Sequence, residues 1–582
     1  MKRTLIYVIS GLATVLFCGC EDALDRFPKD RQTPDNFFRN EEECQLFTND
    51  FYTMFPSSGI YNESADIIAK QSLTNEVLGN RIVPATASTW KWTYLRDINF
   101  FLQYSSNCTD AAVRARYDGV ARFFRAYFYF EKVKYYGDVP YVDTPLSSDS
   151  KELYKGRDPR ETVMRHVLED LDYAIANLPA EKSVYRVTRW TALALKSRVC
   201  LFEGTFRKYH DIADAEFYLS ECAKASKRFI DESGYTVYNA GDTPYLNLFS
   251  SLNASDTEII LARAFNSAIK LSHDVNGYLT SATMGRPGLL KNIANMYLMR
   301  NGEPFTSQTG WETMTLPEES ANRDRRFAQT VRTPGYKRIG ATATSAPDLG
   351  ATMTGYQLIK YLTEAKYDSY NASMNDLPLF RTAEVLLNYA EARAELGEIT
   401  QADIDLAIRP LRERAGVANL SLAAANAAPD PYLASAETGY ANVTGDNKGV
   451  ILEIRRERTV ELLMENLRYW DIMRWKEGKR FEKPFTGLYF PGVGSYDLDA
   501  DGKDDVCIWS GTKPTTNATH VFELDKEIFL SETTHGNIII HTDYKRTWNE
   551  ERDYLYPVPT DDRVLTQGAI SQNPGWNDNL PF

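Results

Sequence analysis

Residues 111–136 constrain the fold most, because apolar side chains cover nearly the whole circumference of the helix that they predict. Val120, Phe123, Tyr127 and Val133 recur at helical spacing, and a narrow polar stripe follows positions 122, 125, 129, 132 and 136. Such a helix must be covered by other protein segments on almost every side. The sequence therefore predicts a helical scaffold packed around residues 111–136.

Further helices are predicted at 161–178, 188–204, 211–231, 381–396, 401–414 and 451–476. Asp158 and Glu161 have the spacing of a helix start with reciprocal capping, and Thr188 is suited to open the next helix. Small residues lie where 381–396 would contact 401–414, as in a tetratricopeptide hairpin, although no 34-residue motif repeats. We expect helix pairs of this type to form the frame.

The composition changes between residues 235 and 354. This stretch is rich in Gly, Pro, Asn, Ser and Thr and contains short strand-like runs such as 258–261. The last hundred residues mix loop and short strand. The predicted fold is therefore mainly α, with a tetratricopeptide-like helix-pair scaffold, an irregular loop-rich lobe and a few short strands. We divide the chain into a leader (1–19), an N-terminal helical region (20–234) and a second region with the loop-rich insertion (235–582).

The first residues have the pattern of a secretion signal. Lys2 and Arg3 precede a mostly apolar run at 4–17, which has the length of a signal-peptide core rather than of a membrane span. Gly19 then precedes Cys20, as in a bacterial lipoprotein cleavage box, so Cys20 is the predicted lipidation site. The alternative is an ordinary secretory peptide cut nearby.

Charge and cysteine content exclude several classes of protein. The net charge is -13 and no basic stripe is present, so we expect no nucleic acid partner. Of seven cysteines two, Cys18 and Cys20, lie at the predicted cleavage box, and the other five are scattered without metal-ligand spacing, which is typical of small buried apolar residues. No HExxH, GxSxG or P-loop motif occurs. A glycosidase with a pair of catalytic carboxylates remains an alternative, because Asp and Glu are abundant.

Several segments, in order, resemble the SusD/RagB family of nutrient-uptake lipoproteins of Bacteroidetes. Ala121 to Phe130 with Tyr136-Gly-Asp-Val-Pro140 is similar to the N-terminal signature of that family. The other matching segments are 170–174 with 178–179, 188–198, 322–327, 381–392, 453–457, 468–475, 554–559 and 572–575. Each motif is weak alone, but the ordered set covers nearly the whole chain and is specific.

The resemblance implies a frame of four tetratricopeptide-like helix pairs and a non-enzymatic role that requires no cofactor. A protein of this family captures glycan at the cell surface and delivers it to a SusC-like TonB-dependent transporter in the outer membrane. Glu21 and Asp22, directly after Cys20, resemble the signal for export to the cell surface. Capture of peptides, a surface glycoside hydrolase and a lid that touches no ligand remain the alternatives.

A sugar site needs an aromatic platform with hydrogen-bonding side chains around it. In the first candidate region Trp90 is the preferred platform and Trp92 the second, while Asn80 and Arg81 are suited to bind hydroxyl groups. The competing interpretation is core packing for the two rings and a solvated loop for Asn80 and Arg81.

The second candidate region runs from Asn276 to Trp311. Tyr278, Arg286 and Trp311 lie among small and polar residues there, where a large ring has little helical core to enter. We therefore predict that these three side chains bind ligand, with packing of a local loop core as the alternative.

A possible structural calcium site lies near the C-terminus. Asp497, Asp499, Asp501 and Asp505 occupy positions 1, 3, 5 and 9 of a loop like that of an EF-hand, with Gly502 at position 6. Position 12 is an isoleucine, so the bidentate glutamate is missing. The pattern predicts either a bound calcium ion that braces the loop or an acidic, solvated turn.

Overall fold

Helix α5 (Ala111–Tyr136) has the bounds that the sequence predicts and lies inside the N-terminal half of the computed structural model, which describes residues 37–582. The Asp110 carboxylate caps it by accepting the N–H groups of Ala112 and Val113 at 2.9 and 3.1 Å. Helices α2 (Glu41–Thr48), α4 (Thr93–Tyr104) and α6 (Arg160–Asn177) pack against it. The predicted leader and Cys20 lie outside the described residues.

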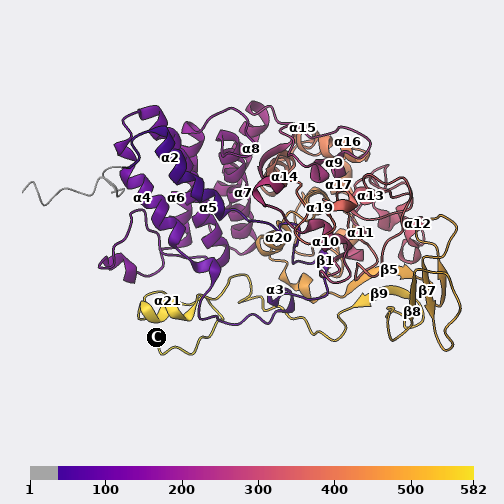
Figure 1. The fold of residues 1–582 in the computed structure, drawn as a ribbon. Helices are drawn as coiled ribbons and strands as arrows, with labels where there is room; N and C mark the ends of the chain where they lie inside the picture. Colours follow the sequence, from indigo (N-terminus) through magenta and orange to yellow (C-terminus); the bar gives the residue numbers. More distant parts are fainter. Residues whose placement is uncertain (1–36) are drawn as a thin grey trace, which may run out of the picture.

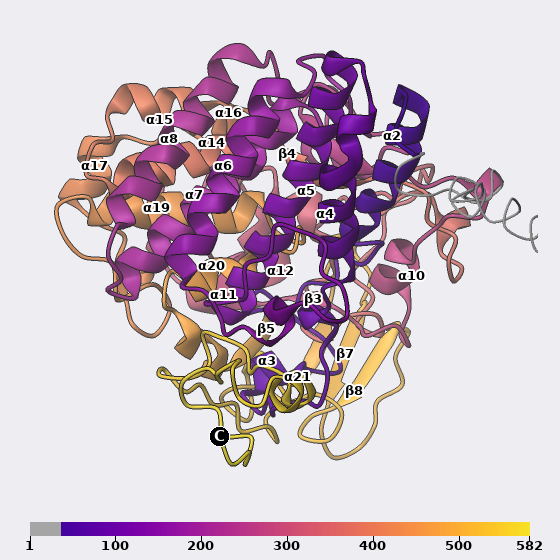
Figure 2. The ribbon, with the colours of Figure 1, turned by 90° about the vertical axis from the view of Figure 1, so that its left-hand side faces the viewer.

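The next helices continue the frame side by side. Helix α6 contacts α7 (Arg189–Tyr209), α7 contacts α8 (Ala215–Glu232), and α8 contacts α14 (Thr382–Glu395), as Figure 2 shows. Thr188 opens α7 with a capping box closed by Thr191, as predicted at its start. The capping prediction for α6 is wrong, because Pro159 is its N-cap and the Asp158 carboxylate instead accepts the N–H of Tyr141.

Two predicted helices are each interrupted. Residues 401–414 form α15 (Gln401–Ala407) and α16 (Arg409–Ala415), with Pro410 in the first turn of α16. Residues 451–476 form α19 (Lys448–Glu461) and α20 (Arg468–Arg474). Between them Met464 and Asn466 adopt left-handed backbone conformations, which a continuous helix does not allow.

The loop-rich lobe contains short elements that are joined by irregular backbone. They are α3 (Asn75–Leu78), α9 (Pro244–Ser250), α10 (Val275–Thr280), α11 (Lys291–Ala294), α12 (Leu316–Ser320), α13 (Phe327–Thr330), α17 (Leu422–Ala427) and α18 (Pro431–Ala434). Strand β1 (Ile68–Ala69) pairs antiparallel with β3 (Gly288–Leu289), and β2 (Ile259–Arg263) with β4 (Leu377–Arg381). These small ladders connect the lobe to segments from the rest of the chain.

The C-terminal segment adds two further small sheets at the end of the molecule that lies opposite the N-terminal helices (Figure 1). Strand β5 (Phe485–Phe490) pairs antiparallel with β9 (Gly536–Ile540). Strand β7 (Val506–Trp509) lies between β6 (Gly494–Tyr496), antiparallel to it, and β8 (His520–Glu523), parallel to it. The chain then returns beneath the helices and ends after α21 (Thr560–Leu565).

Two large apolar cores result. One is rich in aromatic rings and fills the N-terminal helices, and the other fills the loop-rich lobe together with α14, α19 and α20. Both draw residues from either side of residue 234, and the predicted division there stays a prediction. The predicted fold class, mainly α with a loop-rich lobe and few short strands, is confirmed. Among residues 37–582, none of the helices combines the length and apolar character that crossing a membrane requires.

Candidate functional site

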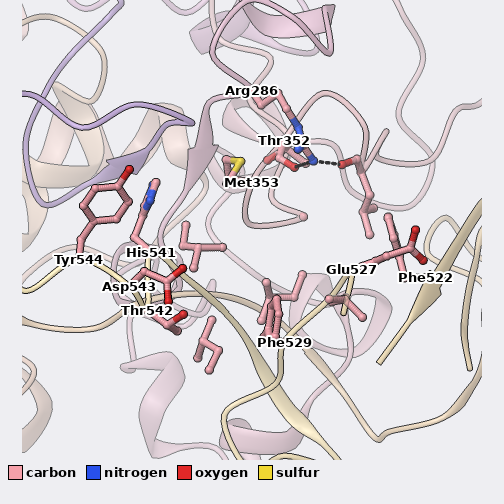
Figure 3. Close-up of a pocket in the computed structure, with 16 residues that line it drawn as sticks. Arg286, Thr352, Met353, Phe522, Glu527, Phe529, His541, Thr542, Asp543 and Tyr544 are labelled. Atoms are coloured by element: carbon pink, nitrogen blue, oxygen red, sulfur yellow. Dashed lines mark hydrogen bonds between the residues drawn. The ribbon is translucent and has the colours of Figure 1, made fainter. Parts of the chain in front are cut away.

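A hollow of about 300 Å³ lies between β9 and the loops around residues 286 and 349–355, and we call it the β9 groove (Figure 3). Its lining combines aromatic, aliphatic and polar side chains. The residues are Arg286, Leu349, Thr352, Met353, Gly355, Phe522, Glu527, Ile528, Phe529, Ile538, Ile539, Ile540, His541, Thr542, Asp543 and Tyr544. A hollow of this size accommodates one or two sugar units.

The groove is built on β9 because pairing with β5 fixes the backbone of Ile539 and Ile540, and a bridge to Leu530 fixes Ile538. His541 follows in a left-handed conformation, and its imidazole Nε2 lies 2.7 Å from the carbonyl oxygen of Lys70. Burial lowers the pKa of His541, so the ring is neutral at neutral pH and Nε2 carries the proton donated to Lys70. The imidazole thus joins the C-terminal segment to β1.

Arg286 forms the opposite wall from a left-handed backbone conformation. Its guanidinium donates to the carbonyl oxygens of Leu349 at 2.8 Å and Thr352 at 3.2 Å, which fixes the loop that faces β9. Gly355 (φ +83°) ends this loop, and a Cβ there would lie 2.6 Å from Leu488 Cδ1. The wall therefore depends on one arginine and one glycine.

Two aromatic rings of the groove are open to solvent. Phe529 is 42% exposed and Tyr544 is 53% exposed, and Figure 3 shows their side chains at different sides of the hollow. The exposed carboxylates of Glu527 and Asp543 lie in the same lining. Apolar ring faces beside hydrogen-bond acceptors suit a ligand that has both a flat apolar face and hydroxyl groups.

Of the seven residues predicted to bind ligand, Arg286 is the one that lines the β9 groove. Trp90 is 3% exposed, and its ring packs against Tyr136 at 4.5 Å and Trp92 at 5.4 Å between ring centroids. Trp92 is half-buried against Phe128. The structure thus corrects the placement of Trp90, because helix α5 offers its ring an apolar surface and no ring face is presented to solvent.

The two polar residues of the first candidate region differ in their exposure to solvent. Asn80 is exposed, whereas Arg81 is 7% exposed and forms an ion pair with Asp553 at 3.3 Å. Its guanidinium carbon also lies 4.4 Å from the ring centre of Tyr556 and 5.4 Å from that of Trp576. Arg81 therefore joins the loop 79–84 to the C-terminal segment and does not face solvent.

The two aromatic residues of the second candidate region also pack inward. Tyr278 is 6% exposed and lies 5.6 Å from Tyr61 between ring centroids. Trp311 is half-buried, with its ring 6.3 Å from Phe305 and 5.8 Å from Tyr432. Loop backbone supplies a core of its own here, so these rings have apolar partners without a helix.

The acidic loop brings three of its four predicted ligands together. One carboxylate oxygen from each of Asp497, Asp499 and Asp501 lies within 4.8 Å of the others. The Asp497 carboxylate accepts the N–H groups of Asp501 and Gly502, and Asp505 instead accepts the N–H of Leu498 at 2.8 Å. The geometry is that of a tight acidic turn, and the calcium prediction stays a prediction.

Phe529 and Tyr544 are not among the residues predicted from the sequence to bind ligand. Both belong to a C-terminal stretch of mixed loop and strand, where neither follows an apolar periodicity that would bury it. The polar neighbours of Tyr544, Thr542-Asp543 and Lys545, are the one available signal, and the same signal was wrong for Tyr278, which is buried.

Comparison with known proteins supports the resemblance. The model of the SusD family matches residues 261–576, which is more than half of the chain. The chain belongs to the SusD family. A second model, described as starch-binding associating with outer membrane, matches residues 50–201 in the N-terminal helices.

Individual SusD-like proteins cover most of the chain. One from Formosa agariphila is 23% identical over 532 residues, which are 82% of this chain and 90% of that protein. A SusD-like protein of Bacteroides fragilis has the same fold, with a TM-score of 0.68 at 20% identity over 94% of this chain and all of that one. A SusD-like carbohydrate binding protein of the same species gives a TM-score of 0.67 at 20% identity, with 91% and 99% covered.

Proposed function

We propose that this SusD-family chain binds glycan at the cell surface, in the β9 groove, and passes it to a SusC-like TonB-dependent transporter without acting as an enzyme. The exposed rings of Phe529 and Tyr544 beside the hollow are the observation that carries the proposal. Each ring is suited to stack on the apolar face of a pyranose, and the polar lining is suited to bind its hydroxyl groups. Binding in the β9 groove therefore depends on stacking against these ring faces and requires no charged group on the ligand.

The names of similar proteins agree with this ligand class. A structure with the same fold belongs to a protein described as carbohydrate binding, and the model that matches the N-terminal helices is named for starch binding and outer-membrane association. The proposed lipid anchor at Cys20 places the groove beside the transporter. A tether raises the local concentration of a weak binder, so a modest affinity is sufficient for transfer. The proposed calcium ion in the acidic loop supports the β6–β7 turn and takes no part in capture.

The test is glycan binding by the full chain, solubilised in a detergent without a sugar headgroup. A glycan array identifies a ligand, and calorimetric titration then compares the protein with its Tyr544→Ala and Phe529→Ala variants. We expect each substitution to weaken binding about tenfold, because loss of one stacking ring removes about 1–2 kcal/mol. Tyr154→Ala is the matched control, since Tyr154 is an exposed tyrosine that does not line the groove.

Three results would contradict the proposal. Unchanged affinity in both groove variants would place glycan binding elsewhere on the molecule. Release of new reducing ends from the bound glycan, abolished by one carboxylate substitution, would make the chain a hydrolase. Binding of peptides in place of every glycan on the array would overturn the ligand class.

A further inference from the structure

A second, smaller hollow of about 180 Å³ lies away from the β9 groove, and the two share no lining residue. It is formed where the 310 helix Asn49–Met54, the turn before α7 and strands β2 and β4 meet. We call it the Arg263 hollow. Its lining residues are Tyr52, Phe55, Tyr185, Leu261, Ala262, Arg263, Ala264 and Leu379.

The walls of this hollow are fixed before any ligand arrives. The Tyr52 hydroxyl oxygen accepts the N–H of Val187 at 3.0 Å, and the Tyr185 hydroxyl donates to the Asp376 carboxylate at 2.7 Å. The N–H of Ala262 donates to the carbonyl oxygen of Val184 at 2.7 Å, so the turn that carries Tyr185 is attached to β2. Rings held in this way lose little conformational entropy on binding.

The side chain of Arg263 is a feature of this hollow that internal contacts do not explain. It ends β2 opposite Leu377, and its Nε is buried without a hydrogen-bond partner. Within residues 37–582 no carboxylate lies within 4.0 Å of its guanidinium, and burial alone lowers its pKa, with no opposing charge contributing. A half-buried guanidinium without an acceptor is costly and retains its capacity to bind an anion.

The surroundings favour an anion over a neutral group. Among the described residues that line the hollow none is acidic, in a chain whose net charge is -13. A second guanidinium, that of Arg186, lies 5.4 Å from the ring centre of Tyr52. Asp376 lies behind Tyr185, where its carboxylate is occupied by the Tyr185 hydroxyl and by the N–H groups of Ala254 and Phe265. Its carboxylate oxygens are therefore already paired with three internal donors.

We infer that the Arg263 hollow is a second saccharide subsite that takes a sugar unit bearing an anionic group, a carboxylate or a sulfate ester. The aromatic side chains contact the apolar ring face, and the Arg263 guanidinium binds the anionic group through paired N–H donors. This ligand class rests on the proposed glycan-binding role, but the position of the subsite does not depend on the β9 groove. The volume corresponds to a single sugar unit.

The experiment uses monosaccharide probes and the full chain in the same detergent. Saturation-transfer NMR titrations give the dissociation constants of glucuronate, glucose 6-sulfate and glucose for the protein and for its Arg263→Gln variant. We expect at least one anionic probe to bind about tenfold more tightly than glucose, and Arg263→Gln to remove that preference. The tighter of the two anionic probes identifies the group as carboxylate or sulfate. Arg228→Gln is the control, because Arg228 is an exposed arginine on α8.

Tyr544→Ala separates this inference from the proposed function. A preference that is lost in Arg263→Gln but retained in Tyr544→Ala supports the Arg263 hollow, whether or not the β9 groove binds glycan. Equal binding of all three probes overturns the inference. A preference that persists in Arg263→Gln, or that Tyr544→Ala removes instead, overturns it as well. Within residues 37–582 the Arg263 side chain makes no hydrogen bond or ion pair that Arg263→Gln would break, so we expect the variant to fold, which circular dichroism checks.

Discussion

The N-terminal helices and the loop-rich lobe differ in how their buried backbone groups find hydrogen-bond partners. In α5 to α8 the helical bonds satisfy the backbone, and the core between the helices is free to be apolar. In the lobe the buried guanidinium of Arg323 donates to the carbonyl oxygens of Ala294, Tyr297 and Glu319. The buried ammonium of Lys360 likewise donates to the carbonyl oxygen of Leu463 at 2.6 Å.

This difference explains why the lobe contains so many buried charges. Irregular backbone inside a protein needs side-chain donors and acceptors, and the charged donors then need carboxylates nearby. Arg381 shows the result, since its guanidinium contacts Glu258, Glu461 and Glu465. The helical core also contains buried ion pairs, such as Arg125 with Asp170, but rings in mutual contact fill most of it, among them Phe38, Phe47 and Phe101. The open hollows and their exposed rings occur where loops supply walls.

The largest expected effect is on the charged network of the lobe. Arg381→Met removes the one guanidinium that contacts Glu258, Glu461 and Glu465 together, so the remaining cations, among them Arg414 and Lys360, must balance these three buried carboxylates. Arg381 is also one of the guanidinium groups that hold the pKa of Glu461 below its usual range. We expect a loss of about 5 kcal/mol in the free energy of unfolding, measured by chemical denaturation. Arg228→Met, which breaks an exposed pair with Glu232, should cost about 0.5 kcal/mol or less. Similar losses in the two variants would contradict this account.

Ring packing in the helical half should have the next largest effect. Phe101 is fully buried in α4, with its ring 5.0 Å from Phe38 and 6.4 Å from Phe51 between centroids. Phe101→Ala should lower the free energy of unfolding by about 4 kcal/mol, because it leaves a cavity among rings. Phe101→Leu is the control, with an expected loss of about 1.5 kcal/mol or less. If the alanine variant lost less than the leucine variant, ring packing would not stabilise this half.

The lobe should also be the more sensitive half to pH. The buried Glu63 carboxyl accepts the N–H groups of Met464 at 3.0 Å and Arg468 at 2.7 Å, and burial raises its pKa from 4.5 to about 7. A raised carboxyl pKa favours the protonated folded state, so this contribution to stability is full below pH 4.5 and is lost as the pH rises through 7.

We compare the protein with Glu63→Gln, which keeps an acceptor oxygen and cannot ionise. The free energy of unfolding of the protein should fall by about 3 kcal/mol relative to the variant between pH 4.5 and 8, since one pKa unit corresponds to about 1.4 kcal/mol. Denaturation curves at several pH values measure the difference. A difference that stays constant across this range would show that the Glu63 carboxyl does not titrate as described.

The smallest effect is expected at the rim of the lobe. Arg286→Gln removes the two hydrogen bonds that fix the loop 349–352, and should lower the free energy of unfolding by about 1–1.5 kcal/mol because the arginine is only half-buried. Hydrogen exchange should increase in residues 349–355 and stay unchanged in α5. Unchanged exchange in that loop, with weaker glycan binding, would show that Arg286 contacts ligand directly instead of fixing the wall.

Periodicity predicted the helical half well, and the failures have local causes. Residues 111–136 were predicted to the residue, because an almost wholly apolar surface leaves few alternatives, and the Asp110 cap in the structure fixes the same start. The prediction of a single helix over residues 451–476 was wrong. The chain leaves the helix where the Glu63 carboxyl group, 401 positions before Met464 and 405 before Arg468, accepts the N–H groups of these two residues. No local pattern contains that partner.

The site was harder to predict than the fold. Trp90 and Tyr278 looked like platforms because their sequence neighbours are polar, yet Tyr136 and Tyr61 cover their rings from elsewhere in the chain. Tyr544 is exposed because it follows β9 in a loop, where its ring contacts the edge of His541 at 5.5 Å between centroids and is otherwise left 53% open to solvent. Whether an aromatic ring in a loop is buried in the core or stays free to stack on a ligand depends on tertiary contacts, which the sequence pattern does not contain.

The sequence by itself determined the family and the helical frame, because helical periodicity and ordered motifs are local properties of the chain. Only the tertiary structure decided which rings meet solvent, that Arg286 braces a wall, and that Arg263 has no carboxylate partner among residues 37–582. Those outcomes depend on which distant segments of the chain come into contact. In a lobe of irregular loops no periodic sequence pattern predicts these contacts.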